Sequence, residues 1–336
     1  MGDFWYRKKV LVTGGSGFIG SHLVERLVTR GAEVTATVRS SDDAADSTLH
    51  SVKDDVNIRE ADLSELSNCL EVCRGQEAVL SIAHVDGSVA FKRSYPALIL
   101  RQNMLITLNM LEAACRSGAE RFLLTSSAEV YPPGAPSPTP ECEGFDNLGE
   151  QLDDGYAWSK RMSEFAAKLF AKQYGIKVAI ARPNNVYGPG DYYDVNRGRV
   201  IPMFIRKALS ADEPILIWGT GEQVRTFLYV DDVARGMLDL TERYATCDPV
   251  NLGGDDEISV RRLAELIAGL SGSRVEIRCD SSKPAGPARR ICDISKAKQV
   301  IGFEPAVKLE EGLRRTIDCY NTMAFARSTA RGVRAS

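Results

Sequence analysis

The sequence predicts an α/β protein in which a doubly wound parallel sheet is followed by a smaller C-terminal α/β lobe. Short apolar, β-branched runs alternate with longer segments of helical periodicity through the first half of the 336-residue chain. Such alternation is typical of parallel strands joined by crossover helices on both faces of one sheet. Beyond residue 183 the alternation loosens into loops and separate helices, and a chain of this length has room for a second lobe.

The expected strands lie at residues 9–13, 33–38, 56–58, 78–83, 121–126 and 176–182. Apolar residues at helical spacing predict helices at 18–30, 95–117, 156–174, 200–209, 230–244, 260–270 and 309–320. We therefore divide the chain into a sheet domain at 1–183, a smaller lobe at 184–325 and a flexible tail at 326–336. Because open α/β sheets bind ligands at the carboxyl edge of their strands, we expect the site in the cleft between the two parts.

Composition argues against several classes of function. The 42 basic and 45 acidic residues give a net charge of −3, which offers no general attraction to nucleic acid or to an anionic membrane. The N-terminal residues lack the apolar core of a signal peptide, and no apolar run approaches the roughly 20 residues of a membrane span. The eight cysteines form no CxxC pair, which favours reduced thiols in a cytoplasmic protein over disulfides or a metal site.

The motif TGGSGFIG lies directly after the first predicted strand and opens the first predicted helix. Gly14 permits a tight turn, Gly17 lets the backbone approach a pyrophosphate, and Gly20 allows close packing of helix on strand. The first helical residues, Phe18 and Ile19, then offer free N–H groups and a partial positive charge to phosphates. Glycines alone could serve only a turn, but this context predicts a Rossmann dinucleotide site.

The end of the second predicted strand indicates which dinucleotide binds. An NAD enzyme usually has Asp or Glu there to hold the ribose hydroxyls, whereas this chain reads Val38-Arg39-Ser40-Ser41. A guanidinium followed by two hydroxyls suits a phosphate dianion. NADP is therefore favoured over NAD, although Arg39 could also be a solvated loop residue.

Tyr156 and Lys160 are four residues apart at the start of a predicted helix, so their side chains share one face. A tyrosine is a poor base at its ordinary pKa of about 10, and a neighbouring ammonium favours its phenolate. Ser127 follows the fifth predicted strand at the same sheet edge, where it can hydrogen-bond the same substrate oxygen. This trio predicts proton exchange with a substrate hydroxyl during hydride transfer.

The order and spacing of these motifs resemble the extended short-chain dehydrogenase/reductases of the nucleotide-sugar epimerase/dehydratase family. The similarity runs over nearly the whole chain, through TGGSGFIG, TSSAEVY, YAWSK, RPNNVYGPG, RTFLYVDD and KPAGPARR. For the cofactor, it implies Asp62 near the adenine and Asn103 on the helix under the active site, with Leu63 and Ala83 as further contacts. Asp62 could instead cap the following helix, and Asn103 could satisfy backbone groups in a bend.

For the substrate, the resemblance implies contacts from both parts of the chain. Asn185 would meet the sugar or its phosphate, Arg225 would grip the diphosphate, and Arg289 with Arg290 would bind the same group or the nucleoside. The remaining expected substrate contacts are His84, Arg199, Val200 and Trp218. The two C-terminal arginines could also be merely solvated, and His84 could be a packed or helix-capping side chain.

Within the family, residues 184–290 are most similar to the GDP-fucose synthases, through NNVYGP, RVIP, IWGTG, FLYVDD and KPAGPARR. That class uses a cysteine and a histidine as acid/base groups for a double epimerisation. Glu129 and Arg199 stand at those positions here, and all three histidines lie in the first third of the chain. Glu129 instead resembles the glutamate of 4,6-dehydratases and related decarboxylases, where a carboxylate can remove the C5 proton once C4 is oxidised. It could also pair with a surface lysine.

These motifs favour an NADP-linked epimerase that transiently oxidises C4 of a nucleotide-sugar and returns the hydride after inversion. A 4,6-dehydratase that uses Glu129 and an NADPH-dependent 4-keto-sugar reductase are the alternatives, and the intact trio argues against a non-enzymatic relative. The resemblance leans to a GDP-sugar, with UDP and dTDP open. It also implies a homodimer formed through the helices at 95–117 and 156–174. We expect a cytoplasmic protein that binds no nucleic acid, membrane or metal.

Overall fold

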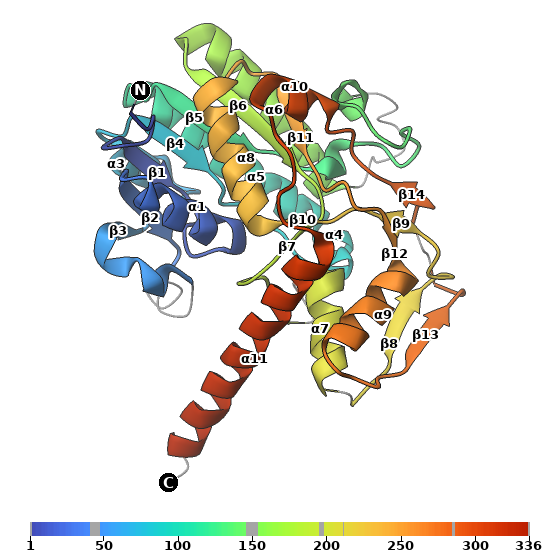
Figure 1. Ribbon diagram of the computed structural model, residues 1–336. Helices are drawn as coiled ribbons and strands as arrows, with labels where there is room; N and C mark the ends of the chain where they lie inside the picture. Colours follow the sequence, from blue (N-terminus) through green and yellow to red (C-terminus); the bar gives the residue numbers. More distant parts are fainter. Residues whose placement is uncertain are drawn as a thin grey trace.

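The computed structural model describes residues 2–40, 48–145, 154–194, 198–210, 212–283 and 286–334. Its centre is a seven-stranded sheet in the order β11-β6-β5-β4-β1-β2-β3, in which every neighbouring pair is parallel (Figure 1). The strands span Lys9–Val12 (β1), Glu33–Val38 (β2), Val56–Glu60 (β3), Ala78–Ser81 (β4), Arg121–Thr125 (β5), Lys177–Pro183 (β6) and Pro249–Leu252 (β11). This order confirms the predicted doubly wound α/β fold.

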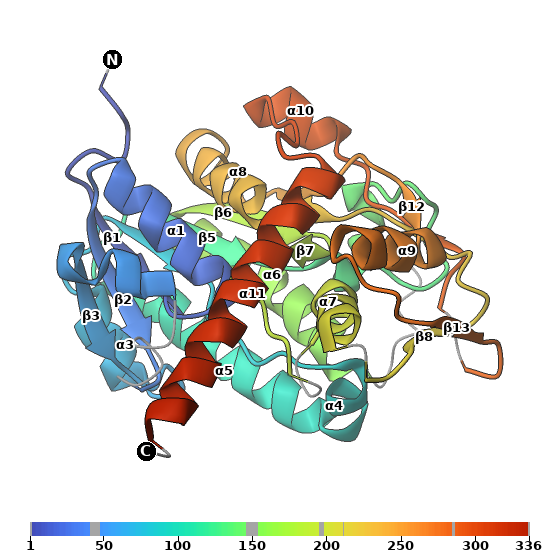
Figure 2. The same cartoon turned by 60° about the horizontal axis from the view of Figure 1, so that its bottom comes forward.

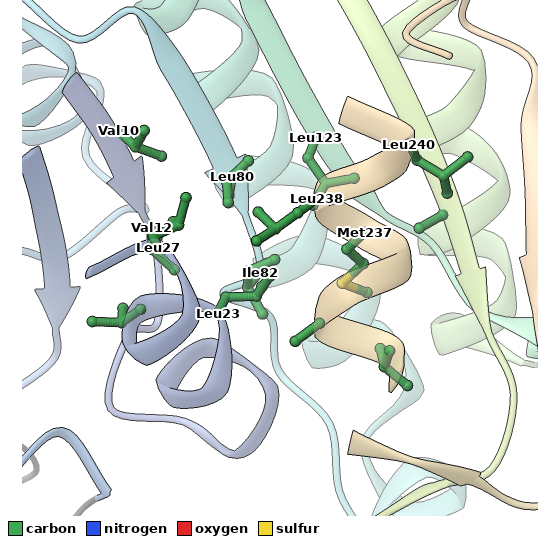
Figure 3. Close-up of a cluster of buried hydrophobic side chains, with 14 of the residues drawn as sticks. Val10, Val12, Leu23, Leu27, Leu80, Ile82, Leu123, Met237, Leu238 and Leu240 are labelled. Atoms are coloured by element: carbon green, nitrogen blue, oxygen red, sulfur yellow. The ribbon is translucent and has the colours of Figure 1, made fainter. Parts of the chain in front are cut away.

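Helices cover both faces of the sheet (Figure 2). One face carries α1 (Phe18–Thr29) and α8 (Val230–Arg243), and the other carries α3 (Leu66–Cys73), α5 (Pro96–Arg116) and α6 (Gly155–Tyr174). On the first face, fully buried residues of the two helices meet Leu80 of β4 and Leu123 of β5; they are Leu23, Leu27, Met237, Leu238 and Leu240 (Figure 3). Because both faces are covered, β4 is buried at all four positions and shows no polar alternation.

Two short elements follow strands at the carboxyl edge of the sheet. The helix α4 (Val89–Ser94) follows β4, and the 3-10 turn η3 (Ala128–Val130) follows β5. The N-terminus of α1 lies at the same edge, because parallel strands all end there. This edge is therefore where side chains distant in sequence meet.

The smaller lobe has its own hydrophobic core around α7 and α9. Its elements are α7 (Val200–Ser210), β8 (Ile215–Trp218), β9 (Val224–Arg225), β12 (Ile258–Ser259), α9 (Val260–Leu270), β13 (Ile277–Asp280) and β14 (Arg289–Arg290). The strand β8 pairs with β13, and β9 lies between β12 and β14. The short strands β7 (Val186–Tyr187) and β10 (Leu228–Tyr229) form a separate parallel pair. The helix α10 (Ser295–Ile301) packs against α8 and β11, and α11 (Leu309–Arg334) ends the described chain.

The predicted boundary after residue 183 does not coincide with the edge of the sheet domain. Both α8 and β11 come from beyond it, yet α8 covers one face of the sheet and β11 pairs with β6 as the outermost strand. The reason is that residues 230–252 repeat the helix-then-strand crossover of the first half, and every residue of β11 is buried. At the C-terminus, α11 continues as helix through Arg334, and so extends into residues 326–336, which were expected to form a flexible tail. Among the described helices, none is both long and apolar enough to cross a membrane.

Candidate active site

The loop between β1 and α1 is shaped by its glycines. Gly14 has a left-handed backbone with φ of +64°, and a Cβ atom there would lie 3.1 Å from the Cα of Ala83. A Cβ on Gly20 would collide with the carbonyl oxygen of Gly14, so α1 can approach the loop only with glycine at that position. Thr37 holds the loop to β2, because its hydroxyl accepts a hydrogen bond from the Gly14 N–H at 3.2 Å.

The N-terminus of α1 presents unused donors to this loop. Its N-cap is Gly17, no side chain caps it, and its first turn contains no acidic residue. The first N–H groups of a helix lack partners within it, and the helix dipole adds positive charge. Phe18 is buried and Ile19 packs against the same core, so both offer only backbone. We refer to the glycine loop and the N-terminus of α1 together as the cradle. The Tyr192 hydroxyl would lie 3.8 Å from a Cβ on Gly17, which places the loop after β7 beside the cradle. These features fit the pyrophosphate of a dinucleotide.

The ends of β2 and β3 lie next to each other on one side of the cradle. Arg39 is exposed directly after β2, and Ser40 follows it, whereas Ser41 lies outside the described residues. Asp62 accepts hydrogen bonds from the N–H and the hydroxyl of Ser64 at 2.9 and 2.7 Å, which lower its pKa. Asp62 therefore stabilises the turn before α3, whose N-cap, Glu65, makes no capping hydrogen bond through its side chain.

Three other residues assigned to the cofactor organise the backbone beneath it. Leu63 is buried, and Ala83 stands directly below Gly14. Asn103 is buried in α5, where its Oδ1 accepts from the Val85 N–H at 2.7 Å and its Nδ2 donates to the Val85 carbonyl at 3.1 Å. The same amide donates to the hydroxyl of Ser159 in α6 at 3.3 Å. Asn103 thus fixes the loop after β4 against α6.

Ser127, Tyr156 and Lys160 converge at the carboxyl edge of β5. Ser127 is the N-cap of η3, and its hydroxyl lies close enough to Tyr156 to lower the pKa of that phenol against the larger effect of burial, which raises it. The Lys160 ammonium donates to the carbonyl of Thr125 at 2.8 Å and lies 5.5 Å from the centroid of the Tyr156 ring. Burial lowers the pKa of Lys160 to about 8. The trio has the relative placement that proton transfer to a bound oxygen needs.

Four charged side chains, Asp86, Lys92, Glu129 and Arg199, surround Tyr156, and we refer to them as the charge cluster. The Lys92 ammonium lies 2.7 and 2.9 Å from the two carboxylate oxygens of Glu129 and 2.9 Å from Oδ1 of Asp86. Arg199 contacts Oδ2 of Asp86 at 3.2 Å. The Lys92 ammonium also lies 3.9 Å from the centroid of the Tyr156 ring. The cluster joins α4, η3, the loop after β4 and the segment before α7.

The charge cluster determines protonation at the site. Burial raises the pKa of Tyr156 well above its ordinary value, and the carboxylates of Asp86 and Glu129 raise it further. Burial alone would lower the pKa of Lys92, but Glu129 and Asp86 outweigh it and raise that pKa. The site therefore holds a protonated phenol beneath a protonated ammonium.

Two further titratable groups lie near the cluster. His84 Nδ1 donates to the carbonyl of Ile82 at 2.7 Å, and the centroid of its ring lies 6.0 Å from that of Tyr156. Burial lowers the pKa of His84 to about 3, so the ring is neutral. Asp191 is buried in the loop after β7, and burial raises its pKa to about 6. Within the described part of the chain, no cluster of His, Cys, Asp and Glu could hold a metal ion.

Two arginines of the smaller lobe lie side by side, and one of them reaches the site. Arg225 of β9 and Arg290 of β14 are partners in register, and burial together with Arg290 lowers the pKa of Arg225. Arg290 donates to the carbonyl of Ala128 at 3.3 Å, directly beside Ser127. Among the described ion pairs, none joins a carboxylate to either guanidinium. This pair of cations fits a diphosphate.

The structure separates Arg289 from that pair. Its guanidinium binds the carboxylate of Glu257, because neighbouring residues of a strand face opposite sides. Asn185 adopts a left-handed backbone with φ of +43°, and its amide donates to a backbone carbonyl at 2.9 Å. Trp218 ends β8 with 47% of its surface exposed, and Val200 begins α7 half-buried.

Three residues of the site were not found by sequence reasoning: Asp86, Lys92 and Asp191. Asp86 could have been found, because it follows β4 at the carboxyl edge, where polar residues gather in this fold class. Lys92 lies on a short helix that no motif marks, and Asp191 follows the YGPG segment without a pattern of its own. Only the folded chain brings them to Tyr156 or to the charge cluster around it.

Comparison with known proteins adds three kinds of finding. The model of the NAD-dependent epimerase/dehydratase family matches residues 10–253. The dTDP-4-dehydro-6-deoxy-D-allose reductase of Streptomyces bikiniensis is 36% identical over 318 residues, covering 94% of this chain and 96% of that protein. GDP-mannose 3,5-epimerase 1 of Oryza sativa subsp. japonica is 31% identical over 320 residues, covering 94% and 82%. The crystal structure of UDP-glucose 4-epimerase from Thermotoga maritima superposes with a TM-score of 0.82 at 28% identity, covering 94% and 99%.

Proposed function

The chain belongs to the NAD-dependent epimerase/dehydratase family, and on that premise we propose that it is an NADPH-dependent reductase of a nucleotide-linked 4-keto sugar. The sequence favoured an epimerase, with this reductase among the alternatives. Two observations support placing the reductase first: the ion pair between Glu129 and Lys92, which counts against reactions that need a free carboxylate, and the similarity to a 4-keto-sugar reductase over nearly the whole chain.

The ion pair carries the proposal because both oxygens of Glu129 are engaged by one ammonium. A 4,6-dehydratase or a C5 epimerase needs a carboxylate that is free to remove a ring proton. Reduction of a ketone needs only a hydride and one proton. The dTDP-4-dehydro-6-deoxy-D-allose reductase, similar over nearly the whole chain, supports the same choice.

The bound cofactor would supply the hydride, and the glycine cradle with the N-terminus of α1 fits its pyrophosphate. Tyr156 is protonated and donates its proton to the oxygen at C4 as the hydride arrives. Ser127 donates a hydrogen bond to the same oxygen and orients it. Lys160 holds its ammonium on the carbonyl of Thr125, where it stabilises the phenolate left behind.

For the cofactor we propose NADP rather than NAD, because the exposed guanidinium of Arg39 stands where a carboxylate would favour NAD. The variant Arg39→Ala should weaken NADP binding about tenfold, the scale of one lost charge-assisted contact, and leave NAD binding nearly unchanged. Fluorescence titration of both cofactors into both proteins checks this. Equal affinity of the wild type for NADP and NAD would contradict it.

For the substrate we propose a nucleoside-diphosphate sugar whose diphosphate lies between Arg225 and Arg290. The exposed indole of Trp218 is available to stack on the base, and Asn185 lies beside β9. The sequence resemblance favours GDP, and the base is resolved by offering the GDP, UDP and dTDP sugars side by side.

We further propose a homodimer formed through α5 and α6. The two helices pack on each other, and their outer faces expose large apolar side chains: Leu98, Leu108, Met162, Phe165 and Leu169. Several large exposed apolar side chains on two packed helices are typical of a protein interface. Sedimentation equilibrium of wild type and Phe165→Glu checks this, since a charge on that face should favour the monomer.

The test of the reaction is a spectrophotometric assay with NADPH and the three nucleotide-linked 4-keto-6-deoxyhexoses. We expect one equivalent of NADPH to be oxidised per sugar reduced, with Tyr156→Phe as the inactive control. The second candidate is a redox-neutral epimerase, favoured by the structural likeness to UDP-glucose 4-epimerase. Turnover of a nucleotide-sugar without net NADPH oxidation would establish that candidate and refute the reductase.

A further inference from the structure

We propose that Lys92 selects the reaction of this site, because it holds Glu129 in an ion pair that keeps the carboxylate from removing a proton next to the keto group. Lys92 is then a positioning residue that acts through Glu129. This role rests on the proposed 4-keto substrate: with Glu129 held by Lys92, reduction is the one reaction left for the bound sugar.

The contacts of Lys92 use all the donors that an ammonium has. Two reach the oxygens of Glu129 at 2.7 and 2.9 Å, and the third reaches Asp86 at 2.9 Å. Arg199 binds the other oxygen of Asp86 at 3.2 Å and so secures that anchor from the smaller lobe. Glu129 is therefore held by a lysine that is itself held in place.

The position of the ammonium matters as much as its charge. It lies 3.9 Å from the centroid of the Tyr156 ring, the residue whose hydroxyl meets the oxygen at C4. Only 16% of the Lys92 side chain is exposed, against 40% for Glu129. The ammonium therefore occupies the space between Glu129 and Tyr156, through which the carboxylate would have to reach a carbon beside C4.

Charge keeps the pair closed over the working pH range. The groups that face Lys92 are Glu129, Asp86 and the ring of Tyr156, with Arg199, neutral His84 and the ammonium of Lys160 beyond them. The two carboxylates raise the pKa of Lys92 despite its burial. A protonated ammonium between two carboxylates has no tendency to release either.

Freeing Glu129 should reveal the chemistry that the pair suppresses. The C5–H bond beside a C4 ketone is acidic, and a free carboxylate can take that proton. The electron pair of the bond then forms an enolate whose oxygen is held by the hydroxyls of Tyr156 and Ser127. A proton from solvent returns to C5, so the step consumes no oxidant or reductant and can be followed as hydrogen exchange.

The experiment measures deuterium exchange at C5 of dTDP- and GDP-4-keto-6-deoxyhexose in D₂O by NMR, with oxidised NADP present so that no hydride can be donated. The proteins are wild type, Lys92→Met, Lys92→Gln, Lys92→Arg and the double variant Lys92→Met/Glu129→Gln. Rates are corrected for exchange without enzyme, and NADP titration shows that each variant is folded.

We expect Lys92→Met and Lys92→Gln to exchange C5 at least tenfold faster than wild type, a threshold set below the roughly 10²- to 10⁴-fold that one general base contributes. Lys92→Arg should stay near wild type, because arginine keeps the ion pair, and the double variant should lose the gain. Wild-type exchange as fast as that of the variants would overturn the proposal. So would the absence of a gain in the variants, or a gain that survives in the double variant.

Failure of the reductase assignment is a separate result. It is read from whether the wild type oxidises NADPH with these sugars, whereas the exchange assay contains no hydride donor.

Discussion

The cofactor cradle and the charge cluster lie at the same edge of the sheet but are built in opposite ways. The cradle uses consecutive residues, and its shape follows from glycines such as Gly14 and Gly20, where a side chain would collide with the loop or with Ala83. The charge cluster includes contacts between residues 37 and 113 positions apart, Lys92 with Glu129 and Asp86 with Arg199, which only the completed fold brings together.

From this difference we expect the cradle to serve cofactor binding and the charge cluster to affect the choice of reaction. A short motif that shapes the backbone can bind a cofactor without determining which reaction the enzyme catalyses. Contacts between distant elements can change one partner at a time, so a single lysine such as Lys92 can redirect the chemistry without disturbing the cradle. Four predictions test this division.

The largest effect is expected at Tyr156, which the charge cluster surrounds. Tyr156→Phe removes the proton donor and little volume, so kcat should fall about 10³- to 10⁴-fold while NADP binding is retained. Steady-state kinetics and a cofactor titration measure the two quantities. Tyr95→Phe, at an exposed tyrosine of α5's N-cap, is the matched control and should be unaffected. A Tyr156→Phe protein within tenfold of wild type would place the proton donor elsewhere.

The cradle should depend on backbone alone. Gly14→Ala forces a side chain onto a φ of +64° and toward Ala83, and should destabilise the protein by about 1–3 kcal/mol and weaken NADP binding at least tenfold. Gly118→Ala carries similar strain at φ of +75° but meets open space away from the site. It should lose stability and keep its affinity for NADP. Denaturant unfolding measures the loss of stability, and titration measures the affinity for NADP. Equal losses of affinity in the two variants would show that the cradle does not bind the cofactor.

The lobe should distinguish two neighbouring arginines. Arg225→Ala removes one of the paired cations at the site, and KM for the nucleotide-sugar should rise about 10- to 100-fold, a cost typical of a lost charge-assisted contact. Arg289→Ala breaks the pair with Glu257 and a hydrogen bond to the carbonyl of Ser137, neither of which involves Arg225 or Arg290, and should change KM less than threefold. Kinetics with saturating NADPH test this. A larger rise in KM for Arg289→Ala than for Arg225→Ala would mean that Arg289 is the residue of β14 that contacts the substrate.

The smallest effect concerns the contact between the cradle helix and α8. His22 in α1 bonds Asp231 at 2.7 Å and the carbonyl of Pro189 at 2.9 Å, so both ring nitrogens face acceptors. Burial alone would lower the pKa of His22, but these partners outweigh it and raise that pKa. The stabilisation is therefore complete below the unfolded pKa of about 6.5 and is lost as pH rises through the folded value.

The variant His22→Asn should accordingly cost about 1 kcal/mol more at pH 6 than at pH 8.5, since one pKa unit corresponds to about 1.4 kcal/mol. Urea unfolding of both proteins at the two pH values gives the difference. A cost that is the same at both would mean that the imidazole is neutral in the folded protein.

The sequence predicted the sheet strands before residue 183 to within about two residues, because parallel strands buried on both faces are continuous apolar runs. It did not predict β11, whose four residues are too short a signal to separate from a loop. The trio of Ser127, Tyr156 and Lys160 was found because it lies in motifs and at a strand end. Lys92 was not, because its position is set by how α4 turns after β4, which no local pattern records.

The place of β11 has a consequence for how the chain is made. Synthesis delivers β6 before β11 and α8, so β6 is an open sheet edge and one face of β5 and β6 lacks its apolar cover until residue 252 has emerged. Residues 184–229 must loop out while the last crossover forms. The first 183 residues therefore contain the glycine loop and the trio of Ser127, Tyr156 and Lys160 but not the complete sheet. The nascent chain becomes a stable enzyme only after three quarters of it has left the ribosome.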